Sequence, residues 1–135
     1  MILIPIKIFI REVCYTLFPI LRWTYRVLGF RFQAPDFKLG KLKSTIQLHE
    51  FKAFLRRRGF ERNHLAWVYD HEVINVRKRL LNGRQYHIRV FKNGAVKGHY
   101  EYSPEHSPLK HYWCERIEAR KNEFKNLLGG FLVFK

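Results

Sequence analysis

The sequence predicts an α+β fold, in which helices pack on one face of an antiparallel meander of three or four strands. Two Asn-Gly pairs, Asn82-Gly83 and Asn93-Gly94, divide residues 73–102 into three β-rich runs, and Asn-Gly is a strong hairpin signal. Apolar residues recur at helical spacing on both sides of this region. The length of 135 residues and the 47% hydrophobic content fit one domain with a real core.

The predicted domain has four parts in chain order. We expect a single domain over residues 1–135, made of an amphipathic N-terminal helix segment (1–30), a connector (31–43), a helix–meander–helix core (44–128) and a C-terminal tail (129–135).

Residues 1–30 predict an amphipathic helix, kinked near Pro19. Its apolar side carries Ile6, Phe9, Ile10, Val13, Leu17, Ile20, Leu21 and Leu28. Its other side carries Lys7, Arg11, Arg22 and Arg26, with Trp23 at the boundary. The longest uncharged run, 13–21, is shorter than the roughly 20 residues that a spanning helix needs. We favour packing of this stripe on the domain's own sheet; contact with an anionic membrane surface or a larger complex is the alternative.

The next helix is predicted over residues 44–58. Ser44 with Gln47 fits a capping box, and Gly59 fits the position just after the helix. Its last turn holds three consecutive cations, Arg56, Arg57 and Arg58. Cations are favourable at this end of the helix dipole, so the triplet is either a solvated helix end or a set of phosphate contacts.

The register of the meander follows from its apolar face. A two-residue turn at the second Asn-Gly would pair Val90 with Lys97, whereas a three-residue loop with a G1 bulge pairs Val90 with Val96. The same test on the first loop pairs Val76 with Ile88. We therefore expect two successive G1-bulge hairpins with one apolar face.

The other face of the meander is polar and mostly cationic. It carries Asn75, Arg77, Arg79, Gln85, His87, Arg89, Lys97, His99 and Glu101, with Phe91 near one end. Burying its three arginines requires carboxylate partners, and the chain has only 11 acids. We therefore expect this face to be exposed and to bind an anionic ligand.

Three further segments complete the expected fold. Residues 64–70 are compatible with another strand, and Ser107-Pro108 begins a helix over 108–128. The tail after Gly129-Gly130 is a short edge strand, an apolar plug or a partner contact.

The formal charge of +15 points to an anionic partner, most commonly nucleic acid. We expect RNA or a ribonucleoprotein rather than DNA. The candidate contacts are Arg77, Arg79, Arg89 and Lys97, a stacking Phe91, and the triplet Arg56, Arg57 and Arg58. The expected location is cytoplasmic, with peripheral membrane attachment as the alternative.

A second interpretation is enzymatic. His87 lies across from His99 in the expected register, beside Glu101, and two imidazoles near arginines are able to cleave a phosphodiester without a metal. No zinc spacing is met, so we expect no metal and no cofactor. Cys14 and Cys114 form no CxxC motif and are expected to be reduced thiols.

Overall fold

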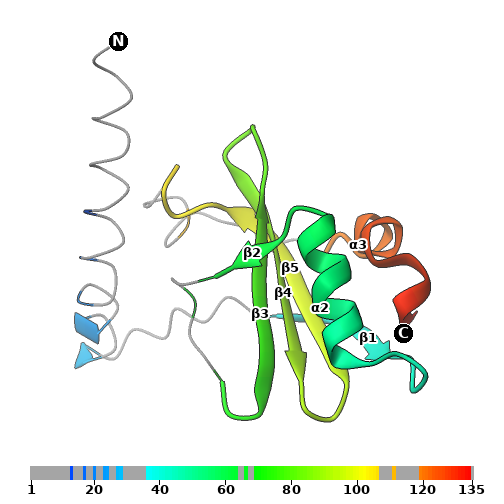
Figure 1. The fold of residues 1–135 in the computed structure, drawn as a ribbon. Helices are drawn as coiled ribbons and strands as arrows, with labels where there is room; N and C mark the ends of the chain where they lie inside the picture. Colours follow the sequence, from blue (N-terminus) through cyan, green and yellow to red (C-terminus); the bar gives the residue numbers. More distant parts are fainter. Residues whose placement is uncertain are drawn as a thin grey trace.

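The computed structural model describes residues 36–63, 66, 69–106, 111 and 119–134, together with Val13, Leu17, Ile20, Trp23, Thr24, Val27 and Leu28. The strands are β1 (Phe37–Leu42), β2 (Glu61–Arg62), β3 (Glu72–Arg79), β4 (Arg84–Phe91), β5 (Ala95–Tyr102) and β6 (Leu132–Phe134). They form one antiparallel sheet in the order β2-β3-β4-β5-β1-β6. Two helices, α2 (Leu48–Arg57) and α3 (Lys121–Leu128), lie on one face of it, and a 3-10 turn (Gly129–Phe131) joins α3 to β6 (Figure 1). The fold is therefore α+β.

The two central loops have the geometry expected from Asn-Gly. Gly83 and Gly94 have φ of 77° and 80°, and the N–H of Gly94 donates to the carbonyl of Phe91 at 2.8 Å. Val90 lies opposite Val96. Val76 likewise lies opposite Ile88, so both pairs match the register argued from the apolar face.

The sheet is larger than three or four strands because β1, β2 and β6 add to the three strands of the meander. β1 lies inside the expected connector and pairs with β5 on one side and β6 on the other. A bulge between Lys38 and Gly40 breaks the alternation of inward and outward side chains. The sequence of this strand therefore lacks the alternating apolar pattern by which a strand is predicted. The tail is the edge strand β6.

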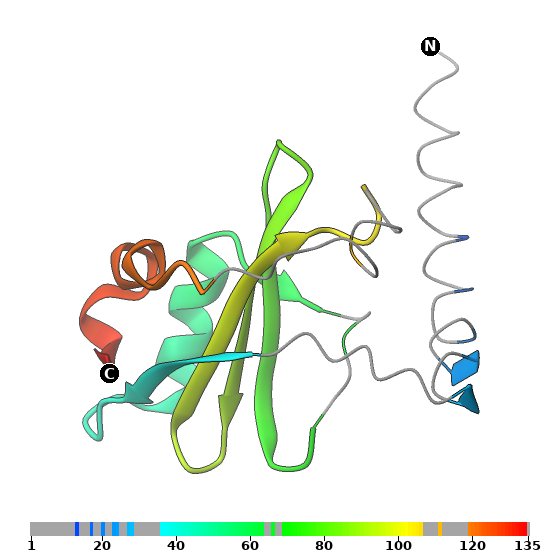
Figure 2. The same ribbon diagram turned by 180° about the vertical axis from the view of Figure 1, so that it is seen from behind.

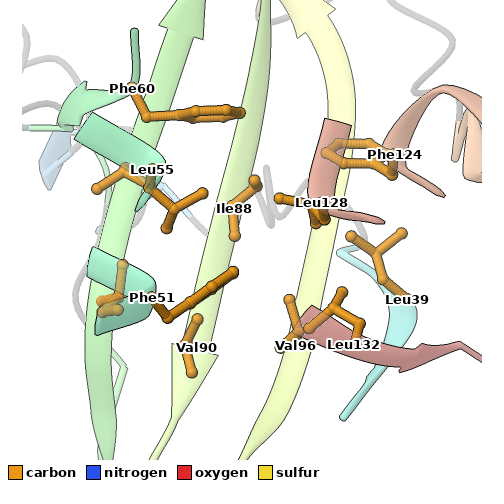
Figure 3. Close-up of a cluster of buried hydrophobic side chains, with 12 residues drawn as sticks. Leu39, Phe51, Leu55, Phe60, Ile88, Val90, Val96, Phe124, Leu128 and Leu132 are labelled. Carbon is orange, nitrogen blue, oxygen red and sulfur yellow. The ribbon is translucent and has the colours of Figure 1, made fainter. Parts of the chain in front are cut away.

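The core lies between the sheet and the helices (Figure 3). Phe51 and Leu55 from α2, and Phe124 and Leu128 from α3, are all at most 1% exposed. They pack on buried sheet residues, including Leu39, Ile74, Val76, Ile88, Val90, Val96 and Leu132. Burial of each such side chain contributes roughly 1.5–3 kcal/mol.

The helix α2 begins later than expected and ends where expected. Its N-cap is Gln47, whose backbone N–H donates to the Glu50 carboxylate at 3.0 Å, so the capping box lies one turn beyond Ser44. At the other end, Gly59 has φ of 85°. The N–H of Phe60 donates to the carbonyl of Leu55 at 3.0 Å, which closes the helix as a Schellman motif.

Two other predicted elements, the helix over 108–128 and the strand within 64–70, differ from the structure in the residues that it describes. Ala119 and Arg120 are not helical, and Arg120 has φ of 38°, so an unbroken helix over 108–128 is wrong; 107–110 and 112–118 lie outside the described residues. Within 64–70, the described residues 66, 69 and 70 are not in a strand. The short strand β2, just before this segment, pairs with β3 instead.

The described residues of the N-terminal segment are largely exposed. Leu17, Ile20 and Leu28 are 47%, 58% and 65% exposed, so these members of the apolar stripe do not cover the sheet as we favoured. Trp23 is also exposed, whereas Lys7, Arg11, Arg22 and Arg26 lie outside the described residues. Among the helices of the described residues, none has the length and apolar character to cross a bilayer.

Candidate functional site

Figure 2 shows the sheet from the side opposite the helices. This face carries a buried set of polar side chains, which we call the polar face. It consists of Asn75, Arg77, Gln85, His87, Arg89, His99 and Glu101 on β3, β4 and β5. Along one row, Arg77 lies opposite His87, which lies opposite His99. All except the half-buried Asn75 are at most 5% exposed. This face is therefore not the exposed cationic surface expected from the sequence.

Arg77 is neutralised within the fold. Its Nη2 lies 2.5 Å from Oε1 of Glu105, which follows β5, and its Nε lies 3.4 Å from Glu61 on β2. Its Nη1 donates to Oε1 of Gln85 at 3.3 Å. The guanidinium is thus held by two carboxylates and an amide, which is how a buried arginine is tolerated.

Arg89 is neutralised in the same way at the other end of the polar face. Its Nη1 donates to Oε2 of Glu72 at 2.5 Å, and its Nε lies 2.9 Å from Oδ2 of Asp36, which precedes β1. The ring of Tyr69 lies 4.7 Å from the guanidinium carbon, a cation–π contact. The chain has only 11 acids, but several of them lie on the polar face beside Arg77 and Arg89, so both buried guanidiniums are paired.

His99 lies between two carboxylates. Its Nδ1 lies 2.6 Å from Oδ1 of Asp36, and its Nε2 lies 3.2 Å from Oε2 of Glu101. Burial opposes the imidazolium, but the charge of Glu101 and hydrogen bonds to both carboxylates outweigh it and raise the pKa of His99 to about 9. The same contacts hold the pKa values of Asp36 and Glu101 below their usual range despite burial. The group is therefore an ion triad at neutral pH.

His87 is in the opposite state. Burial first, and then repulsion from His99 and Arg89, lower the pKa of His87 to about 3, so the ring is neutral at pH 7. Its Nε2 lies 2.7 Å from Oδ1 of Asn75, which fits an N–H donated to that oxygen and leaves a lone pair on Nδ1. The ring centroids of the two histidines are 4.9 Å apart and nearly perpendicular, at 79°.

The contacts join into one network across the sheet. Gln85 receives a hydrogen bond from Arg77, and its Nε2 donates to Oε1 of Glu101 at 2.7 Å, which links the two halves. The order along the network is Glu105, Arg77, Gln85, Glu101, His99, Asp36, Arg89 and Glu72. His111 also joins it, because its Nδ1 lies 3.4 Å from Oε2 of Glu101 and 2.7 Å from the carbonyl of Tyr102.

The chemistry available to this face is limited by its burial and charge. An acid–base pair is normally marked by two groups whose pKa values are driven apart, as those of His87 and His99 are. Both rings are 3% exposed, and the carboxylates beside His99 would repel a phosphodiester. The arrangement suits a cation better: one potential ligand atom from each of Asp36, His87 and His99 lies within 4.8 Å of the others. No sequence pattern marked Asp36 as part of this group, because it lies 63 positions from His99.

The remaining predicted contacts lie apart from this network or at its rim. Arg79 is 43% exposed and lies 2.7 Å from Glu61, and Nζ of Lys97 lies 5.1 Å from the centroid of the Phe91 ring. The triplet Arg56, Arg57 and Arg58 is exposed on α2, on the other side of the sheet. The structure therefore separates the predicted cations into a buried, paired set and an exposed set.

Comparison with known proteins adds no functional assignment. No protein-family model matches the chain, and no curated protein or solved structure matches it.

Proposed function

We propose that this protein binds nucleic acid, RNA or a ribonucleoprotein in preference to DNA, through cations on the helix side of the sheet. One observation carries the proposal: the polar network withdraws acids from the surface. Asp36, Glu72, Glu101 and Glu105 have side chains at most 10% exposed, and they are four of the 11 acids. These four acids and the two buried arginines together carry a formal charge of −2. Because the formal total is +15, the rest of the chain therefore carries +17, with histidines counted as neutral.

The C-terminal end of α2 is the best-placed part of this surface. Arg56, Arg57 and Arg58 are consecutive and exposed, and the single acid of α2, Glu50, lies in its first turn. Lys78 of β3 comes close to this end, since a Cβ placed on Gly59 would lie 3.8 Å from its Cε. Guanidinium groups bind phosphate oxygens in bidentate fashion, so three adjacent ones suit a phosphate backbone.

The test is a charge-matched pair of variants in a binding assay. Fluorescence anisotropy with labelled single- and double-stranded RNA and DNA should show a loss of at least tenfold in affinity for R56Q/R57Q/R58Q at low salt. The control K38Q/K41Q/K43Q removes the same charge from exposed lysines at and just after β1, and its loss should be clearly smaller. Equal losses in both variants would contradict a site at α2. A denaturing gel of the same samples checks the alternative, because shortened probe would favour cleavage by the histidine pair.

A second candidate function is peripheral membrane binding, favoured by one observation. Leu17, Ile20, Trp23, Val27 and Leu28 are all exposed apolar side chains of the N-terminal segment, between 47% and 66% exposed. Exposed apolar groups near cations are typical of an interfacial helix. Co-sedimentation with vesicles of phosphatidylserine and phosphatidylcholine tests this: I20E/V27E should lose binding while R56Q/R57Q/R58Q retains most of it. Unchanged sedimentation of I20E/V27E would reject the membrane role.

A further inference from the structure

We propose that Asp36, His87 and His99 bind a divalent transition-metal ion, with Zn²⁺ as the type case. Each residue offers one ligand atom, and these atoms lie within 4.8 Å of one another. Two imidazole nitrogens and one carboxylate oxygen form an established ligand set for zinc and for other first-row divalent ions. The three ligands come from β4, β5 and the residue before β1, so the ion would tie β1 to the centre of the sheet.

Each proposed ligand is already oriented by a second partner. Nε2 of His87 contacts Oδ1 of Asn75 at 2.7 Å, and Nε2 of His99 lies 3.2 Å from Glu101. Metal-binding histidines characteristically donate their other N–H to a carboxylate or carbonyl oxygen, which fixes the tautomer and the ring orientation. Because Nε2 of each ring has such a partner, we assign the cation to Nδ1; Nδ1 of His87 lies 4.0 Å from Oε1 of Glu101, and Nδ1 of His99 contacts Asp36, the third proposed ligand.

The carboxylate is held in the same manner. Oδ2 of Asp36 lies 2.9 Å from Nε of Arg89, while its Oδ1 lies 2.6 Å from Nδ1 of His99. A ligating nitrogen must be deprotonated, so the ion takes the place of the proton shared between Oδ1 and Nδ1, and that proton is released to solvent. Three protein ligands leave the fourth tetrahedral position to water.

The charge of the buried network supplies an independent argument for a cation. Among the described residues, it contains four carboxylates, two guanidiniums and the imidazolium of His99, a formal charge of −1 with His87 neutral. Uncompensated charge in a buried site is costly. Exchange of the His99 proton for one divalent ion brings the sum to zero without adding another buried side chain.

The test measures metal binding by the full chain, independently of nucleic acid. Chelator-treated protein titrated with Co²⁺ should develop visible d–d bands that saturate at one ion per chain, and Zn²⁺ should displace the Co²⁺. D36N and H87Q should each weaken Co²⁺ binding by at least 100-fold, whereas H49Q, which changes an exposed histidine on α2, should bind as the parent does. Parent protein without saturable bands, or D36N and H87Q binding as tightly as the parent, would overturn the proposal.

A second variant tests the site without replacing a ligand, in case D36N or H87Q fails to fold. N75A keeps all three ligands and removes only the partner of His87, and loss of such an outer partner typically weakens metal binding about 10- to 100-fold. Zn²⁺ should also raise the Tm of the parent and of H49Q, and raise it less for N75A. A Tm shift of equal size in N75A and the parent would place the ion elsewhere on the chain.

Discussion

At the scale of single residues, the buried arginines depend on particular carboxylates. Arg77 is the largest fully buried side chain among the described residues, and its closest acid is Glu105. E105Q should lower the free energy of unfolding by about 3 kcal/mol, because it leaves a buried guanidinium without its main counter-charge.

The matched control is E61Q. Glu61 also contacts Arg77, at 3.4 Å, but its side chain is 45% exposed, so its loss should cost under about 1 kcal/mol. Urea unfolding of the three proteins measures both values. Similar costs for E105Q and E61Q would show that the buried ion pair contributes no more than an exposed one.

The two histidines predict opposite limbs of a pH–stability curve for chelator-treated protein. The pKa of His99 is raised from 6.5 to about 9 by its carboxylates, so its stabilisation is complete below pH 6.5 and is lost as the pH rises toward 9. The pKa of His87 is lowered from 6.5 to about 3, so below pH 6.5 this residue takes up a proton in the unfolded chain but not in the folded chain. The free energy of unfolding therefore falls as the pH drops below 6.5. Stability should therefore be greatest near pH 6.5.

Thermal unfolding between pH 5 and pH 9.5 measures this curve. H99Q should lose the alkaline limb, since a glutamine near Asp36 and Glu101 does not titrate. The alkaline limb persisting unchanged in H99Q would assign it to a different group.

At the scale of elements, local signals predicted the centre of the sheet and not its borders. The loops at Gly83 and Gly94 are specified by adjacent residues, and the apolar alternation of the flanking strands specifies the register. β1 has neither advantage, because its alternation is broken by a bulge and its partner β5 lies more than fifty residues away. The burial of the polar face was missed for the same reason: two of the acids that neutralise it, Asp36 and Glu105, lie outside the strands that carry the arginines.

The contact between α3 and the sheet depends on a residue without a side chain. Gly98 of β5 faces the helices, and a Cβ there would come 3.2 Å from Cζ of Phe124 and 2.6 Å from the carbonyl oxygen of His87. G98A should therefore lower the unfolding free energy by about 1–3 kcal/mol through overpacking. G130A is the control, because a Cβ at Gly130 meets nothing within 4 Å. Urea unfolding compares the two, and equal stability of G98A and the parent would mean that α3 is not seated as described.

At the scale of the whole molecule, the fold separates charge within the part of the chain that the structure describes. Acids gather on the polar face around Arg77 and Arg89, and cations such as Arg56 and Lys52 remain on the helix side. Only part of the candidate site was predictable from the sequence, because this separation of charge depends on contacts between distant segments. The residue types and the His87–His99 pairing follow from the register, but which arginines are exposed depends on contacts between distant segments.

The most direct test of the surface-cation proposal is the salt dependence of binding to a labelled single-stranded RNA. Log affinity should fall linearly with log salt for the parent, and the slope should become shallower by about 2 in R56Q/R57Q/R58Q, since each lost phosphate contact removes about 0.7 from it. K38Q/K41Q/K43Q should keep a slope near that of the parent. An unchanged slope in the α2 variant, or binding that does not depend on salt, would contradict the claim that these exposed arginines contact phosphates.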